Sequence, residues 1–106
     1  MAIDNSAIAV PAPELIAAMT GSLALVGVLV ANPTIIILDN QSTSSMILYI
    51  NGVQWKTFAA GEALVLDLRA ANGRASNYSF RVGDVFQGNG AATGNFSISY
   101  LYAQNM

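Results

Sequence analysis

Apolar and polar residues alternate along most of the chain beyond residue 44, and this two-residue period is typical of strands with one buried face. The pattern predicts strands over residues 45–50, 53–58, 63–69, 78–84 and 96–102. Asn51-Gly52, between the first two segments, indicates a tight hairpin because both positions of such a turn need a positive φ. The inward-facing positions expected from the alternation include Leu64, Leu66, Leu68, Tyr78, Phe80, Val82, Phe96, Ile98, Tyr100 and Tyr102.

The segment from Leu15 to Ala31 differs, because it is uncharged and largely apolar. Its length is near the minimum that a transmembrane helix needs, but no Lys or Arg flanks it to anchor or orient such a helix. Asn32-Pro33 then marks a turn. We therefore expect no membrane span, and instead two strands at residues 23–31 and 34–39, the first of them buried on both faces.

Residues 1–16 are rich in alanine and contain Pro11 and Pro13, which disfavour both a helix and a central strand. Pro13-Glu14 is compatible with one helical turn through residues 15–19. Because this segment cannot bury its own apolar residues, it is either a disordered tail or an arm that lies against another molecule.

Six or seven short strands joined by turn residues predict an all-β fold, either an antiparallel β-sandwich or a jelly-roll-like barrel. Within it, the glycine-rich residues 87–95 are expected to form a long flexible connection. The predicted organisation is an extended N-terminal arm, residues 1–16, followed by one β-sandwich domain, residues 17–106.

Charge is scarce, since 4 basic and 6 acidic residues make up 9% of the chain, against about 25% in a typical domain. A mostly neutral, polar surface has little electrostatic repulsion between copies, and this favours a protein that is covered in an assembly. A plain soluble β-domain is the alternative. The few cations and a pI near 4.5 argue against nucleic-acid binding.

The chain has no cysteine and no histidine, which excludes disulfides, thiolate or imidazole metal ligands and imidazole-dependent triads within it. Glu62, Asp67 and Asp84 invite a catalytic role, but they fall in a turn, on an exposed strand face and at a strand end. The glycine-rich loop after Asp84 has too few carboxylates for calcium and lacks a P-loop lysine. We expect no enzymatic activity, no cofactor and no metal.

Five aromatic residues are candidates for a sugar-stacking platform: Tyr49, Trp55, Tyr78, Tyr100 and Tyr102. The alternation instead places most of them in the core or in a subunit interface. Asn-x-Ser sequons begin at Asn40, Asn77 and Asn95, and they matter only in a eukaryotic secretory pathway.

Three stretches, VANPTIIILDNQSTSSMILYING, FAAGEALVLDL and GNFSISYLY, resemble a recurring pattern in small virion proteins of tailed bacteriophages. In those proteins an Ala-Asn-Pro turn, a strand and an Asn-x-Ser/Thr turn precede a Gly-Glu-x-Leu/Val-x-Leu-Asp strand. The likeness covers roughly residues 28–102 and departs from the pattern at Thr34-Ile35, where basic residues are expected.

The resemblance implies a decoration (cement) protein on the capsid surface of a virion, assembled in the host cytoplasm. Such proteins typically form homotrimers that bind the major capsid protein and tie neighbouring capsomers together. Head-fibre and tail components are neighbouring roles. The alternative from another functional class is a carbohydrate- or receptor-binding β-module.

The N-terminal arm is the candidate contact site with another subunit or with the capsid. Its contact residues are expected to be Ile3, Ile8, Val10, Pro11, Pro13, Leu15 and Ile16. Burial of each large aliphatic side chain contributes about 1.5–3 kcal/mol, which must exceed about 1–2 kcal/mol per residue for ordering the backbone. The arm is therefore expected to be ordered only against a partner.

Overall fold

The structure is a computed structural model and describes residues 7–68 and 80–105. These residues form strands and no helix: β1 (Ala7–Pro11), β2 (Leu15–Ala18), β3 (Leu23–Val28), β4 (Pro33–Asn40), β5 (Met46–Ile50), β6 (Val53–Phe58), β7 (Ala63–Asp67), β8 (Val85–Gly90) and β9 (Asn95–Asn105). The predicted all-β fold is confirmed. The helical turn expected at residues 15–19 is wrong, because this segment forms β2 and pairs with β9.

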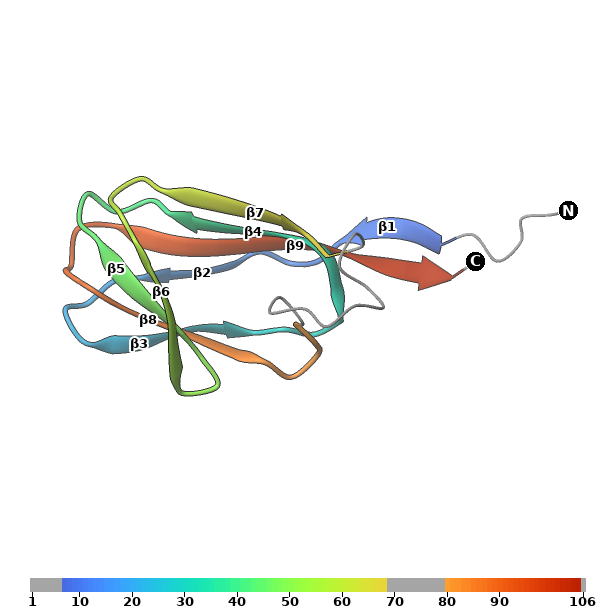
Figure 1. The fold of residues 1–106 in the computed structure, drawn as a ribbon, viewed down its shortest axis with the longest axis horizontal. Coiled ribbons are helices and arrows are strands. Elements are labelled where there is room, and N and C mark those ends of the chain that lie inside the picture. Colours follow the sequence, from blue (N-terminus) through green and yellow to red (C-terminus); the bar gives the residue numbers. More distant parts are fainter. Residues whose placement is uncertain (1–6, 69–79, 106) are drawn as a thin grey trace, which may run out of the picture.

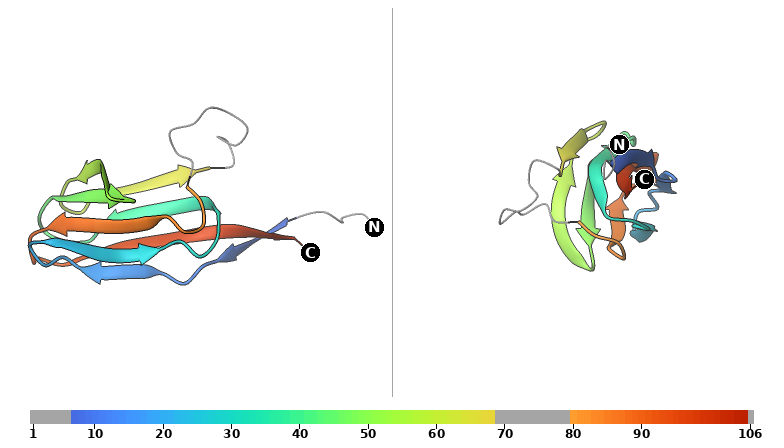
Figure 2. Two further views of the ribbon diagram at one scale, coloured as in Figure 1. Left: turned by 90° about the horizontal axis from the view of Figure 1, so that it is seen from below. Right: turned by 90° about the vertical axis from the view of Figure 1, so that its right-hand side faces the viewer.

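The strands form two antiparallel sheets packed face to face as a β-sandwich (Figures 1 and 2). Sheet A contains β1 and β2 along β9, followed by β4 and β7, and sheet B has the order β3-β8-β5-β6. β2 pairs with β9, β3 with β8, β4 with β7 and β5 with β6. The two halves of the chain thus pair as one long antiparallel hairpin, which is rolled up into two layers. This arrangement is a jelly roll.

The turn at the tip of this long hairpin is the predicted Asn51-Gly52 turn, which the structure confirms. Asn51 has a φ of 53° and Gly52 a φ of 82°, as the turn requires. The core lies between the two sheets, where Phe58 of sheet B and Phe96 of sheet A meet edge to face with ring centroids 5.2 Å apart. This contact ties the two layers together through aromatic packing.

Residues 87–95 do not form the flexible connection that their glycines predict. Gly88 and Gly90 belong to β8, a central strand of sheet B. A Cβ atom on Gly88 would lie 2.8 Å from Cε of Met46, and one on Gly90 would lie 2.7 Å from Cβ of Met46. Glycine at these positions allows the methionine to pack against the strand, so here a glycine-rich sequence marks close packing.

β3 differs from the predicted strand in extent and in burial. It ends at Val28, lies at the edge of sheet B, and leaves Leu23 and Leu25 47% and 57% exposed. The expectation of a strand buried on both faces is wrong, because only one face of this edge strand meets the core. None of the residues that the structure describes belongs to a helix long and apolar enough to cross a membrane.

The strand predicted for residues 78–84 is wrong over its described part. Phe80 is buried as expected, but Val82 is exposed and the chain turns at this point. The Arg81 amide donates to Oδ2 of Asp84 at 3.0 Å, and Gly83 has a φ of 95°. Tyr78 lies outside the described residues. A carboxylate cap and a glycine therefore close a turn where the alternation predicts a strand.

The N-terminal residues form an edge of sheet A despite their prolines. The Ala12 amide donates to the Tyr100 carbonyl at 2.9 Å. Successive amides of an antiparallel strand point alternately towards its partner strand and away from it. The amides of residues 8, 10 and 12 therefore face β9, and positions 9, 11 and 13 face away from it. Pro11 and Pro13 thus stand where no ladder hydrogen bond is lost, which is how an edge strand tolerates proline.

Asparagine side chains hold the crossovers between the sheets at both ends of β4. Asn40 is fully buried, where its Nδ2 donates to the Ser44 carbonyl at 3.0 Å and its Oδ1 accepts from the Ser42 hydroxyl at 2.7 Å. At the other end, Oδ1 of Asn32 accepts from the Val82 amide at 2.7 Å. The Ala-Asn-Pro and Asn-x-Ser motifs therefore contribute to the fold by satisfying turn groups.

Candidate functional site

The outer face of sheet A carries a continuous apolar surface formed by four strands. In the strand register, Ile35 pairs with Leu101 and Leu101 with Pro11, while Ile37 pairs with Val65. We call these five residues the apolar face. Ile37 is 38% exposed and Val65 is 61% exposed. Exposed aliphatic side chains that touch across neighbouring strands are typical of a surface that another molecule covers.

A hollow of about 330 Å³ opens in the apolar face. It is lined by Pro11, Ile35, Ile37 and Leu101 together with Ala12, Ser99 and Tyr100. The hollow lies beside the break between β1 and β2, where the pairing along β9 shifts by one residue. Such a shift bends the edge strand locally, and here it leaves room for an aliphatic side chain from another molecule.

Of the predicted contact residues, only Pro11 belongs to the apolar face. Ile3 lies outside the described residues, Ile8 and Val10 belong to β1, and Pro13 lies between β1 and β2. Leu15 packs against the core, Ile16 is exposed on β2, and Pro11 belongs to the apolar face. The described part of the arm pairs with β9 of the same chain, and the predicted boundary after residue 16 divides β2.

β1 and the end of β9 project beyond the other strands (Figure 1). Ala103 to Asn105 pair with Ala9 to Ala7, whereas the pairing of β4 with β9 ends where Pro33 meets Tyr102. We call residues 7–11 and 101–105 the ribbon. Among the described residues, no other strand pairs with the outer side of β1 or with β9 beyond Tyr102, and the ribbon contains no charged residue. Two strands alone are marginally stable, and an open, uncharged edge readily pairs with another strand.

The outer face of sheet B has a different character. Its central strand, β8, presents Gln87 between Leu25 and Tyr49, and Asn89 between Leu23 and Ile47. The amides of β8 therefore separate the exposed leucines of the edge strand from the apolar residues of β5.

The turns that precede β7 and β8 lie at opposite ends of the sandwich (Figure 1), and they are capped by Glu62 and Asp84, two of the three candidate acids. Oε1 of Glu62 accepts from the Ala59 amide at 2.8 Å, and its Oε2 lies 3.2 Å from Nζ of Lys56. The amide hydrogen bond and then the lysine hold the pKa of Glu62 below its ordinary value of 4.5. Asp84 accepts from the Arg81 amide.

Asp67, the third acid, lies on the exposed face of β7 in the row of Ile35. The three acids therefore do not converge. Within residues 7–68 and 80–105, no group of three or more acidic side chains is placed to hold a metal ion.

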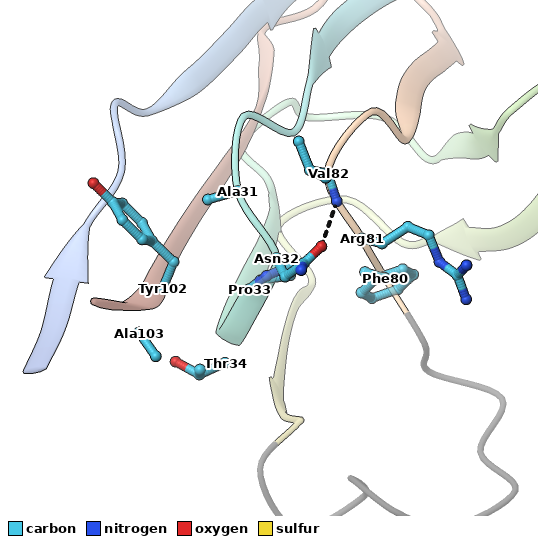
Figure 3. Close-up of a pocket in the computed structure, with 9 residues that line it drawn as sticks. All are labelled: Ala31, Asn32, Pro33, Thr34, Phe80, Arg81, Val82, Tyr102 and Ala103. Atoms are coloured by element: carbon cyan, nitrogen blue, oxygen red, sulfur yellow. Dashed lines mark hydrogen bonds between the residues drawn. The ribbon is translucent and has the colours of Figure 1, made fainter. Parts of the chain in front are cut away.

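A larger hollow of about 710 Å³ lies at the base of the ribbon (Figure 3). Oδ1 of Asn32, which points into it, already accepts from the Val82 amide. The Arg81 guanidinium and the Tyr102 hydroxyl point to opposite sides. A small-molecule site needs polar groups that converge on one point, so we do not assign a ligand to this hollow.

The candidate aromatic platform is not assembled among the described residues. Tyr100 is buried, and its hydroxyl accepts a hydrogen bond from the Val30 amide. Trp55 packs against Phe80, whereas Tyr49 lies on the outer face of sheet B. Tyr102 lines the larger hollow, and Tyr78 is outside the described residues. The sequon at Asn40 is likewise inaccessible, because its side chain is buried and hydrogen-bonded.

Four residues of the apolar face, Ile35, Ile37, Val65 and Leu101, were absent from the predicted contact set. The signal for two of them was the run Thr34-Ile-Ile-Ile-Leu38. Because β4 turns Ile36 and Leu38 into the core, Ile35 and Ile37, which alternate with them, must face outward. A strand that is apolar on both faces in a two-layer fold therefore indicates an exposed apolar surface.

Comparison of this chain with protein-family models, with curated proteins and with solved structures gave no match.

Proposed function

We propose that the protein is a structural virion protein of the decoration (cement) type, which binds the outer surface of a capsid and stabilises the contacts between capsomers. The ribbon carries this proposal, because it projects from the body, contains no charge and leaves the outer side of β1 unpaired among the described residues. The sequence resemblance supplies the virion context. Jelly rolls are common in viral capsid and lectin domains, which supports the proposal at the level of fold alone.

The ribbon binds by adding a strand to an exposed sheet edge of the shell. Its backbone groups at Ala9 face outward from β1, away from β9. Main-chain hydrogen bonds of this kind provide affinity without demanding a particular partner sequence. Because the ribbon is uncharged, the binding persists in moderate salt.

The resemblance further implies homotrimers on the shell, a prediction that stands as the alternative to the two-fold pair inferred below. Several linked copies would each present a ribbon to the surface, so that their combined affinity exceeds that of one copy. The protein then ties capsomers together because it is anchored to more than one of them.

The test uses Ala9→Pro, which removes an outward amide without removing a ladder hydrogen bond, and capsids assembled from the major capsid protein of the same genome. The unchanged protein should sediment with these capsids, whereas Ala9→Pro and a deletion of residues 1–13 should remain largely in the supernatant. Leu25→Ser, on the outer face of sheet B, is the matched control and should sediment normally. The proposal is wrong if the unchanged protein fails to bind, or if both ribbon variants bind as tightly.

A further inference from the structure

We infer that two copies of this chain associate through the apolar face, with sheet A of one copy packed against sheet A of the other. This contact is separate from the strand pairing of the ribbon, so the two can succeed or fail independently. It assigns to Ile35, Ile37, Val65 and Leu101 a role that the folded monomer does not require of them.

The shape of the surface suits a second sheet. Two sheets stack face to face at about 10 Å when aliphatic side chains from both fill the space between them. The apolar face presents such side chains on β4, β7 and β9, and its hollow of about 330 Å³ accepts one more. Ile37 and Val65, which project from the same surface, are side chains of a suitable kind in the second copy.

The area of sheet A is compatible with a weak, specific pair. Four strands spaced about 4.8 Å apart and a β4 of eight residues rising about 3.3 Å each give a flat area of about 500 Å². Two copies then bury about 1,000 Å², at the lower limit for a specific interface. We therefore expect an association that depends on protein concentration, with a dissociation constant on the order of micromolar or weaker.

The distribution of charge permits identical copies to meet. A pair of identical surfaces brings like charges together, which opposes association wherever a charged patch lies at the centre. The five residues of the apolar face are all uncharged, and the acids Asp39 and Asp67 lie at its margin. Since the apolar face itself carries no charge, added salt should leave the pair intact.

The symmetry of the pair follows from the use of one surface by both copies. Such an interface is isologous and has a two-fold axis, so a residue near its centre lies close to its own counterpart. Ile37 occupies this position, because it lies between Val65 and the hollow. A ring of three copies uses two different surfaces instead, which distinguishes this pair from the trimer that the resemblance implies.

The test exploits the absence of cysteine from the chain. Single-cysteine variants Ile37→Cys and Leu25→Cys place one thiol on the outer face of each sheet, and Val65→Cys is a second variant on sheet A. The unchanged protein is examined by size exclusion with light scattering over a range of concentrations. We expect a mass that rises towards twice the 11.1 kDa of one chain, and mild oxidation that cross-links Ile37→Cys several-fold more than Leu25→Cys.

Circular dichroism and thermal melting verify that each variant is folded before it is oxidised. Three results overturn the inference: a mass of one chain at every concentration, a mass of three chains, or cross-linking of Leu25→Cys to the same extent as both sheet A variants. A protein that stays monomeric but sediments with capsids removes this inference and leaves the proposed function standing.

Discussion

The two sheets share one core but differ on their outer faces. Sheet A turns large aliphatic and aromatic side chains inward and an apolar face outward. Sheet B likewise turns Phe58 and Phe86 inward, beside the glycines of β8 that accommodate Met46, but it turns the amides of Gln87 and Asn89 outward. The residues exposed on sheet B are also apolar at its edge, but the amides of its central strand interrupt them.

This difference indicates which side of the molecule gains most from being covered. An exposed amide keeps its hydrogen bonds to water and loses them when a partner covers it imperfectly. An aliphatic side chain has no such bonds, so covering it is favourable in proportion to the area removed from water. By this reasoning we propose that sheet A, together with the ribbon that extends from it, is the assembly side of the protein.

The largest effect is expected from removing volume behind the apolar face. Ile98 is fully buried on the inner face of sheet A, and Ile98→Ala leaves a cavity there. We expect a loss of about 2–5 kcal/mol in the free energy of unfolding, measured by chemical denaturation. Ser99→Ala, on the other face of the same strand, is the control and should change stability by less than about 0.5 kcal/mol. Equal effects would show that the sides of sheet A are wrongly assigned.

A substitution that adds volume to the inner face of sheet B should also destabilise the fold. Gly90→Ala places a Cβ 2.7 Å from Cβ of Met46 and 3.3 Å from the Ser45 carbonyl oxygen, neither of which moves easily. We expect a cost of about 1–3 kcal/mol from overpacking, again by denaturation. Gly88→Ala meets only the flexible ends of methionines and should cost less. A Gly88 variant that is the less stable of the two would contradict this packing.

The outer face of sheet B can be made to resemble that of sheet A. Gln87→Val with Asn89→Val joins Leu23 and Leu25 to the apolar residues of β5 in one surface. Since valine suits an exposed strand, the monomer should remain folded, with a change within about 1 kcal/mol. Light scattering should then show stronger association than in the unchanged protein. If association is unchanged, an apolar sheet face is not enough to bring copies together.

The smallest effect concerns the turn that links sheet B to sheet A through β6 and β7. The pKa of Glu62 is lowered in the folded state, because the Ala59 amide and Lys56 favour its carboxylate form. Its contribution to stability is therefore present above the ordinary pKa of 4.5 and is lost as the pH falls through the lower folded value. Glu62→Gln should reduce the loss of melting temperature on acidification. A parallel pH profile for both proteins would contradict the capping role.

The sequence predicted the two-layer fold better than it predicted which surfaces of the fold are exposed and apolar. Alternation located β5, β6, β7 and β9 because their periods follow from one buried face and one solvated face. It failed at β8, since Gly88 and Gly90 occupy inward positions that are explained by neighbours distant in the chain, chiefly Met46 and Met19. It also failed at β1 and β2, where proline is tolerated because the strand lies at an edge.

The candidate site was less predictable for a related reason. The predicted contact set lay entirely in the first 16 residues, whereas the apolar face combines Pro11 with residues of β4, β7 and β9. Strand neighbours far apart in the chain are determined by topology and register, which a local pattern does not contain. The run of isoleucines in β4 was visible in the sequence. Which of them face outward became clear only from the position of β4 in the two-layer sandwich.

The most direct test of the assembly side is covalent labelling of the unchanged protein, read out by mass spectrometry. Labelling of Ile37, Val65 and Leu101 is compared with labelling of Leu23 and Leu25, first in dilute solution, then at high concentration and on capsids. We predict that the sheet A residues become protected as the protein assembles, while Leu23 and Leu25 stay as reactive as in dilute solution. Protection of the two leucines, with Ile37 and Val65 remaining reactive, would contradict the account.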